Sequence, residues 1–141
     1  MFFVNDGLGY LLKLLQPLWN AGSPPDNLTL ILFENNYTVV QTTNWGNLTE
    51  ATFSGYARQS LQSWATPAFN SATNQWSVTE VPRSFVSTAA GPTVYGWGIV
   101  ADIPATNQLL MAANFPSPIT IPGAGTVVGP ILPSIIDQDL S

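Results

Sequence analysis

The order of apolar and polar positions divides the chain into a short helical segment and a longer region of extended runs. Between residues 6 and 16, four leucines recur at the i, i+3, i+4 and i+7 spacing of one helical face: Leu8, Leu11, Leu12 and Leu15. A helix this short is only marginally stable alone, so we expect it to dock on its own domain or on a neighbouring subunit. The sequence therefore predicts an N-terminal helical arm over residues 1–22. Residues 23–141 are expected to form a β-sandwich domain with an extended C-terminal segment.

Two runs give the strongest strand predictions. Residues 28–33 are apolar at positions that point to both faces of a strand, as in the centre of a sandwich core. Residues 93–101 alternate between a large face and a small face. The large face carries four residues: Thr93, Tyr95, Trp97 and Ile99. The small face includes Gly96 and Gly98, and glycines at alternate positions are typical of close approach by another backbone or a large side chain.

Five further runs predict shorter strands: 58–64, 75–81, 83–87, 109–115 and 126–132. A helix competes for the first of these runs, because Leu61 and Trp64 also fit a helical spacing. Pro116 and Pro118 are expected to end the strand before them, and Pro133 to confine the last strand to a sheet edge. About eight short strands, with turns roughly every 8–12 residues, predict a mainly β fold, an antiparallel β-sandwich.

Composition narrows the possible functions. The 141 residues include 3 Lys+Arg, 8 Asp+Glu, no His and no Cys, and the formal net charge is -5. Charged residues make up 8% of the chain, against roughly 25% in an ordinary soluble domain. Without His or Cys, the chain lacks a Ser–His–Asp triad, a thiolate nucleophile and the usual ligands of transition metals. So few cations argue against nucleic acid as a partner and against a basic membrane-binding surface.

The pattern predicts neither a membrane span nor a signal peptide. The longest uncharged stretch, residues 103–136, is interrupted by prolines that forbid a continuous helix of ~20 residues. The apolar N-terminal stretch opens without a basic segment and carries Asp6 before its apolar part. This order favours a structural role for the stretch over a signal peptide.

The carboxylates are the remaining candidates for catalysis or metal binding. Two of them could act as the acid and base of a glycosidase, so a small hydrolase is one alternative function. No spacing singles out such a pair among Asp6, Asp26, Glu34, Glu50, Glu80, Asp102, Asp137 and Asp139. The densest acidic spot, residues 137–139, is at the C-terminus, where a solvated tail is expected rather than a calcium site. We therefore expect no enzyme activity, no cofactor and no metal.

Association with other protein surfaces is the function that the composition favours. Few charges and many apolar residues describe a chain close to the threshold of self-association, so we expect a homo-oligomer. Trp45, in a polar loop, could instead stack on a sugar face, although the aromatic residues of a small sandwich mostly fill its core or an interface. The interface candidates lie in this loop and at the two ends of the chain: Leu8, Leu11, Leu12, Leu15, Trp19, Trp45, Val127, Val128, Ile131 and Leu132.

Four segments carry a resemblance to a known family. They read NLTLILFENN at 27–36, NLTEATFSGYA at 47–57, TVYGW at 93–97 and PITIPG at 118–123. In this order, behind a short leucine-rich segment, they resemble a family of small virion proteins of tailed phages, found especially in phages of aquatic bacteria and cyanobacteria. The resemblance covers roughly residues 5–130. The chain departs from the family pattern at Ile31, where a basic residue is usual, and in its longer hydrophobic tail, residues 131–136.

The resemblance implies a place in the virion. Members of the family resemble capsid decoration, or cement, proteins, which implies that this chain binds the shell of the major capsid protein and stabilises it. A dimer or trimer on a symmetry axis of the capsid surface, made in the host cytoplasm, is the expected form. The alternative is a carbohydrate- or receptor-binding module on a phage tail or fibre.

Overall fold

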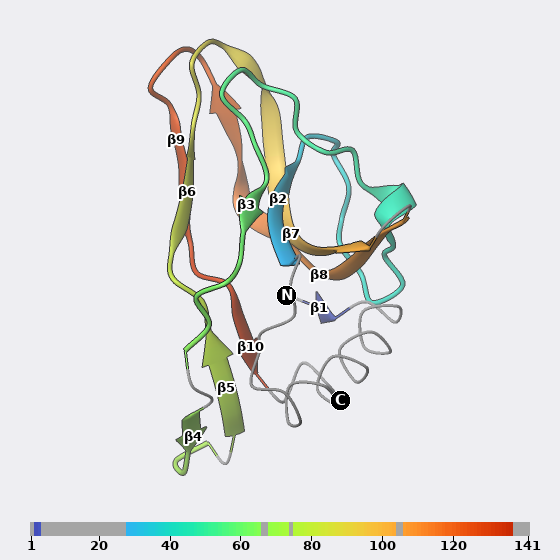
Figure 1. Ribbon diagram of the computed structural model, residues 1–141. Coiled ribbons are helices and arrows are strands. Elements are labelled where there is room, and N and C mark those ends of the chain that lie inside the picture. Colours follow the sequence, from blue (N-terminus) through green and yellow to red (C-terminus); the bar gives the residue numbers. More distant parts are fainter. Residues whose placement is uncertain (1, 4–27, 66–67, 74, 104–105, 137–141) are drawn as a thin grey trace.

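The computed structural model describes residues 2–3, 28–65, 68–73, 75–103 and 106–136, and these are mainly β (Figure 1). Every strand pairing among them is antiparallel. The elements are β1 (Phe2–Phe3), β2 (Leu28–Phe33), the 3₁₀ helix η1 (Trp45–Asn47), β3 (Gln59–Ser60), β4 (Ala68–Asn70), β5 (Gln75–Thr79), β6 (Arg83–Val86), β7 (Gly91–Ile103), β8 (Thr106–Ile121), β9 (Val127–Ile131) and β10 (Ser134–Ile136). The predicted mainly β class is confirmed. The predicted helix over residues 6–16 lies outside the described residues.

The strands form three sheets. A five-stranded sheet has the order β1-β8-β7-β2-β3, a three-stranded sheet the order β10-β5-β4, and β6 pairs with β9. We call the β6–β9 pair the ribbon. In Figure 1 the ribbon stands beside the five-stranded sheet, and the β10-β5-β4 sheet continues below it, away from the core.

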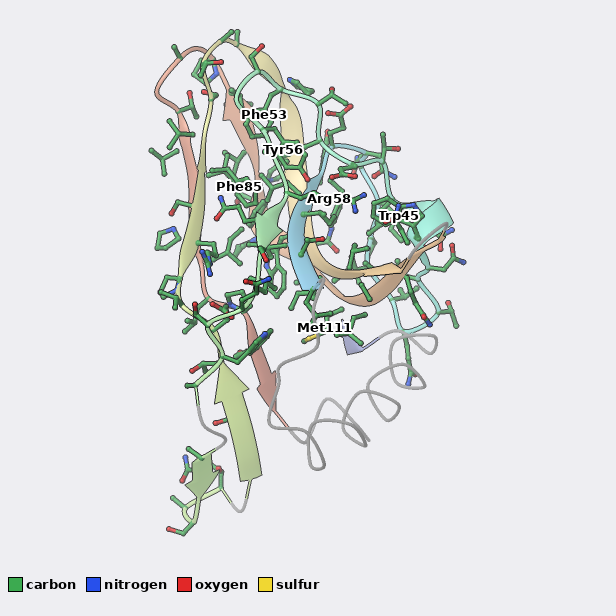
Figure 2. The ribbon with its side chains drawn as sticks, viewed as in Figure 1. Trp45, Phe53, Tyr56, Arg58, Phe85 and Met111 are labelled. Atoms are coloured by element: carbon green, nitrogen blue, oxygen red, sulfur yellow. The ribbon has the colours of Figure 1, made fainter. Side chains whose placement is uncertain are left out.

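The main core lies between the five-stranded sheet and the ribbon. Each layer contributes buried apolar side chains, for example Leu30 from β2, Ile99 from β7, Phe85 from β6 and Val128 from β9. Figure 2 shows Phe85 in the space between the two layers. Because the two-stranded ribbon has only one face on this core, its other face is left for solvent or for a partner.

The strand β2 matches its prediction from end to end. Leu30 and Leu32 point into the main core, whereas Ile31 and Phe33 belong to a second apolar cluster on the opposite face of the sheet. This burial on both faces confirms that residues 28–33 form a central strand. Ile31 is fully buried, so an apolar side chain suits this position of the strand.

The segment between β2 and β3 covers the second cluster. Val39 and Leu48 are buried there, with Trp45 packed at the margin. Asn114 of β8 pins the segment, because its Oδ1 accepts the N–H of Val39 at 2.8 Å and its Nδ2 donates to the carbonyl of Tyr37 at 2.7 Å. The backbone of this segment is therefore held by the side-chain amide of Asn114, in place of the backbone of a neighbouring strand.

The alternation predicted for residues 93–99 is wrong at one point. Val94 lies in the main core with Ile99, whereas Tyr95 packs against the second cluster. The β7–β8 register shifts between Val94 and Gly96, and such a bulge turns the following side chains to the other face. Thr93, Tyr95, Trp97 and Ile99 therefore do not share one face.

The prediction that prolines end the strand over 109–115 is also wrong, since β8 continues to Ile121. Val94 pairs with Ile119 and Gly96 with Asn114, so Pro116 and Pro118 fall where β8 has extra residues relative to β7. Residues in such an irregularity make no regular ladder bonds, so the missing N–H of proline breaks none.

Two other predicted strands differ in outcome: the first is much shorter than predicted, and the last has about the predicted length. Of the run 58–64, only Gln59–Ser60 is a strand, although Leu61 is fully buried and its N–H donates to the carbonyl of Leu28 at 2.8 Å. The strand predicted over 126–132 is confirmed as β9. Among the described residues β9 pairs only with β6, as an edge strand does.

Candidate functional site

The charged side chains whose placement is described are all engaged in hydrogen bonds or ion pairs. Glu50 pairs with Arg58, and Glu80 pairs with Arg83. The carboxylate of Glu34 accepts two hydrogen bonds from Thr52, one from its backbone N–H at 2.9 Å and one from its hydroxyl at 3.1 Å. The described surface therefore offers few charges that are free to recruit a charged partner.

The first ion pair, between Glu50 and Arg58, is bidentate and lies at the edge of the main core. Arg58 Nε donates to Glu50 Oε1 at 2.8 Å, and Arg58 Nη2 donates to Glu50 Oε2 at 2.7 Å. The hydroxyl of Tyr56 donates to Glu50 Oε1 at 2.8 Å, and Arg58 Nη1 reaches Asn107 Oδ1 at 3.0 Å. Both carboxylate oxygens thus accept donors from the chain itself, as in a structural ion pair.

The electrostatics of this network favour the charged form of the glutamate. Burial alone raises the pKa of Glu50, but the hydrogen bonds from Arg58 and Tyr56 and the charge of Arg58 outweigh it, so the pKa lies below its usual value. Burial, the hydrogen bond to Glu50 and its negative charge raise the pKa of Tyr56. The phenol therefore stays protonated as a donor.

Tyr56 also links the network to the core. Its ring meets Phe53 edge to face, with centroids 5.4 Å apart, and stacks on Phe85 at 5.6 Å. Figure 2 shows these three rings in succession from the 50–58 loop to the ribbon. The loop that holds the ion pair is thus tied to β6 by aromatic packing.

Trp45, the residue predicted as a possible sugar platform, lies in η1 beside Arg58 (Figure 2). Its half-buried ring packs against the second cluster, and Arg58 Cζ lies 5.2 Å from the ring centroid. A sugar platform needs an open ring face, whereas this ring is engaged by the guanidinium and by the cluster. The geometry therefore favours a packing role for Trp45.

The second ion pair is more deeply buried, where the ribbon meets the β10-β5-β4 sheet. The carboxylate of Glu80 is fully buried and accepts the N–H of Ser63 at 2.8 Å and the N–H of Val81 at 3.1 Å. Arg83 Nη2 completes the set at 3.0 Å. This buried carboxylate stabilises the segment that passes from the β10-β5-β4 sheet to the ribbon. Neither this ion pair nor the Glu50 pair was predicted from the sequence.

Most of the exposed large apolar residues in the described part of the chain lie on the ribbon or directly beside one end of it. Val86 is 51% exposed, Val127 54%, Leu132 53% and Val81 49%. A fifth such residue, Val40 at 44%, lies elsewhere, in the segment after β2. We call the first four the ribbon patch.

Apart from Trp45, the predicted interface residues fall into three groups. Val127 and Leu132 are exposed in the ribbon patch, whereas Val128 and Ile131 are buried in the main core because they point to the inner face of β9. Those two buried residues are not available at the surface. The remaining candidates apart from Trp45 lie outside the described residues: Leu8, Leu11, Leu12, Leu15 and Trp19.

Searches of protein-family models, curated proteins and solved structures found no match to this chain. In the part of the chain that the structure describes, no helix is both long and apolar enough to cross a membrane. The same part contains no group of three or more Asp or Glu side chains placed to hold a metal ion. The features that stand out are therefore the internally paired charges and the ribbon patch.

Proposed function

We propose that this chain is a structural virion protein that decorates a phage capsid and stabilises it by binding the shell of the major capsid protein. The observation that carries the proposal is the internal pairing of the described charges, which leaves a surface suited to neutral and apolar contacts. The resemblance of four sequence segments to small phage virion proteins supports the same role.

A neutral adhesive surface suits a symmetric shell. Each contact on a capsid is repeated by symmetry, so modest binding at each contact adds up to a stable coat when copies are linked. Such binding depends on shape and buried area rather than on reactive groups. In this proposal the five-stranded sheet and the ribbon are the two layers of a small β-sandwich, and the leucine-rich segment at 6–16 is the arm that contacts the shell.

The test is the binding of purified protein to capsids that lack it. Added wild-type protein is expected to bind in a fixed ratio to the major capsid protein and to raise the temperature at which the capsids open. In the arm, Leu12→Asp is expected to reduce the bound ratio at least tenfold, whereas Gln16→Asp, which adds the same charge at a polar position, should bind normally. Capsids that bind no added wild-type protein would refute the proposal.

A further inference from the structure

We propose that two copies of this chain associate through their ribbon patches about a two-fold axis. The inference concerns the free protein and does not depend on the capsid role. The face in question is the outer face of the ribbon together with the adjoining residues 81–82 and 132, which carries four of the five exposed large apolar residues given above.

The backbone register places the patch on the outer face. Phe85 pairs with Val128, and both are buried, so their neighbours Val86 and Val127, which also pair with each other, point away from the core. Leu132 follows the buried Ile131 and is exposed in the same way. One end of the ribbon thus carries the cross-strand pair of valines.

The other end carries Val81 and Leu132. Arg83 pairs with Ile131, and the N–H of Glu80 donates to the carbonyl of Pro133 at 2.9 Å, so the residues between them run alongside each other. Between the two apolar ends lie exposed Ser84 and Pro130, which are uncharged.

This distribution is self-complementary. A two-fold axis across the middle of the ribbon places Val127 of one copy over Leu132 of the other, and Val86 over Val81. Each apolar end then meets the apolar end of the other copy, as an isologous interface requires. The arrangement is the face-to-face packing of two sheets, which lie about 10 Å apart in proteins.

The charge distribution favours a second copy over a charged partner. The ribbon patch has no charged member, and the nearest charged groups with described side chains, Glu80 and Arg83, are paired with each other. A polyanion or an acidic membrane surface would therefore find nothing to bind there. A second copy brings an equally neutral surface to the contact.

Packing by faces is also favoured over the addition of a strand at the free edge of β9. An added strand at the free edge of β9 would need a row of N–H donors, and Pro130 within β9 has none. Proline on an edge strand is a common barrier to edge pairing. Packing through the outer face uses side-chain contacts and needs no backbone N–H donors, so Pro130 does not prevent it.

The size of the ribbon sets the strength of the dimer. An outer face of about six residues in each of two strands measures roughly 20 by 10 Å, or about 200 Å² per copy. Stable complexes bury about 800 Å² per partner, so the contact should be weak. The free protein is therefore expected to exchange between monomer and dimer in the high micromolar to millimolar range.

Sedimentation velocity over this concentration range tests the inference. The wild-type protein should show a sedimentation coefficient that rises with concentration, and Val127→Asp should abolish the rise. Val40→Asp, which adds the same charge at an exposed valine outside the patch, should leave it unchanged. Thermal unfolding of both variants confirms that they fold. A wild-type protein that stays monomeric throughout, or a Val127→Asp variant that dimerises normally, would overturn the inference.

A mixing experiment tests the two-fold geometry itself. Val127→Asp and Leu132→Lys are each expected to be monomeric, but their equimolar mixture should form a heterodimer, because the introduced charges face each other across the axis. A mixture that stays monomeric would contradict the geometry. Capsid binding is measured separately, so a monomeric wild-type protein that still coats capsids would remove this inference and leave the proposed function standing.

Discussion

The ring of Phe33 lies over Gly96, its partner across the β2–β7 ladder. A Cβ placed on Gly96 would come within 2.5 Å of Phe33 Cζ and would clash with the carbonyl oxygen of Ala113. The glycine is therefore required by close approach from two neighbouring strands, as its position in the alternating run predicts.

Replacing Gly96 by Ala is expected to destabilise the fold by about 1–3 kcal/mol, because the buried ring or the strand must move. Gly123 is the matched control, since a Cβ there meets nothing within 4 Å. Urea unfolding of Gly96→Ala and Gly123→Ala measures the difference. Equal stability of the two variants would show that the space around Gly96 is not tight.

Acid should weaken the fold through Glu50. The pKa of this carboxyl is lowered in the folded protein from a reference value of 4.5, so the ionised form adds stability above that value. The contribution is lost as the pH falls through the lower folded pKa, where the carboxyl takes up a proton in both states. Wild-type protein should therefore melt at a higher temperature than Glu50→Gln near neutral pH, and the gap should close in acid. A gap that stays constant down to pH values below the folded pKa would contradict this assignment.

The two ion pairs should differ in strength because their acids differ in burial. Arg83→Met leaves the fully buried carboxylate of Glu80 without its cation, which is expected to lower the free energy of unfolding by about 3 kcal/mol. Arg58→Met leaves Glu50 within reach of water, because the Glu50 side chain is 24% exposed. This substitution should lower the free energy of unfolding by about 1 kcal/mol. Chemical unfolding of both variants provides the comparison. The reverse order of costs would show that the loop network, rather than the buried acid, dominates.

Features that the local sequence encodes could be predicted, whereas features that depend on residues far apart in the chain could not. The strand β2 was predictable because a run buried on both faces leaves its mark in every residue from 28 to 33. The bulge in β7 was not, since a register shift depends on which residues of β8 stand opposite. The same holds for Pro116 and Pro118, which are tolerated only because the pairing is irregular beside them.

The side-chain networks were less predictable than the strands. Glu50 and Arg58 are eight positions apart in a loop, a separation that predicts no contact, and Glu50 is itself placed by a bridge to Phe33 at the end of β2. Glu80 and Arg83 stand three positions apart, and an acid that close to one of very few cations was an available signal. The exposure of Val127 and the burial of Val128 follow from strand alternation, once it is known which face of β9 meets the core.

The proposed role requires binding through neutral and apolar contacts, so the salt dependence of binding to capsids is the decisive measurement. Attraction between charged surfaces is screened by salt, whereas apolar contacts are not. Capsids that lack the protein are titrated with it at low and at molar sodium chloride. We expect a dissociation constant that is unchanged or slightly lower at high salt. A dissociation constant that rises tenfold or more with salt would contradict it.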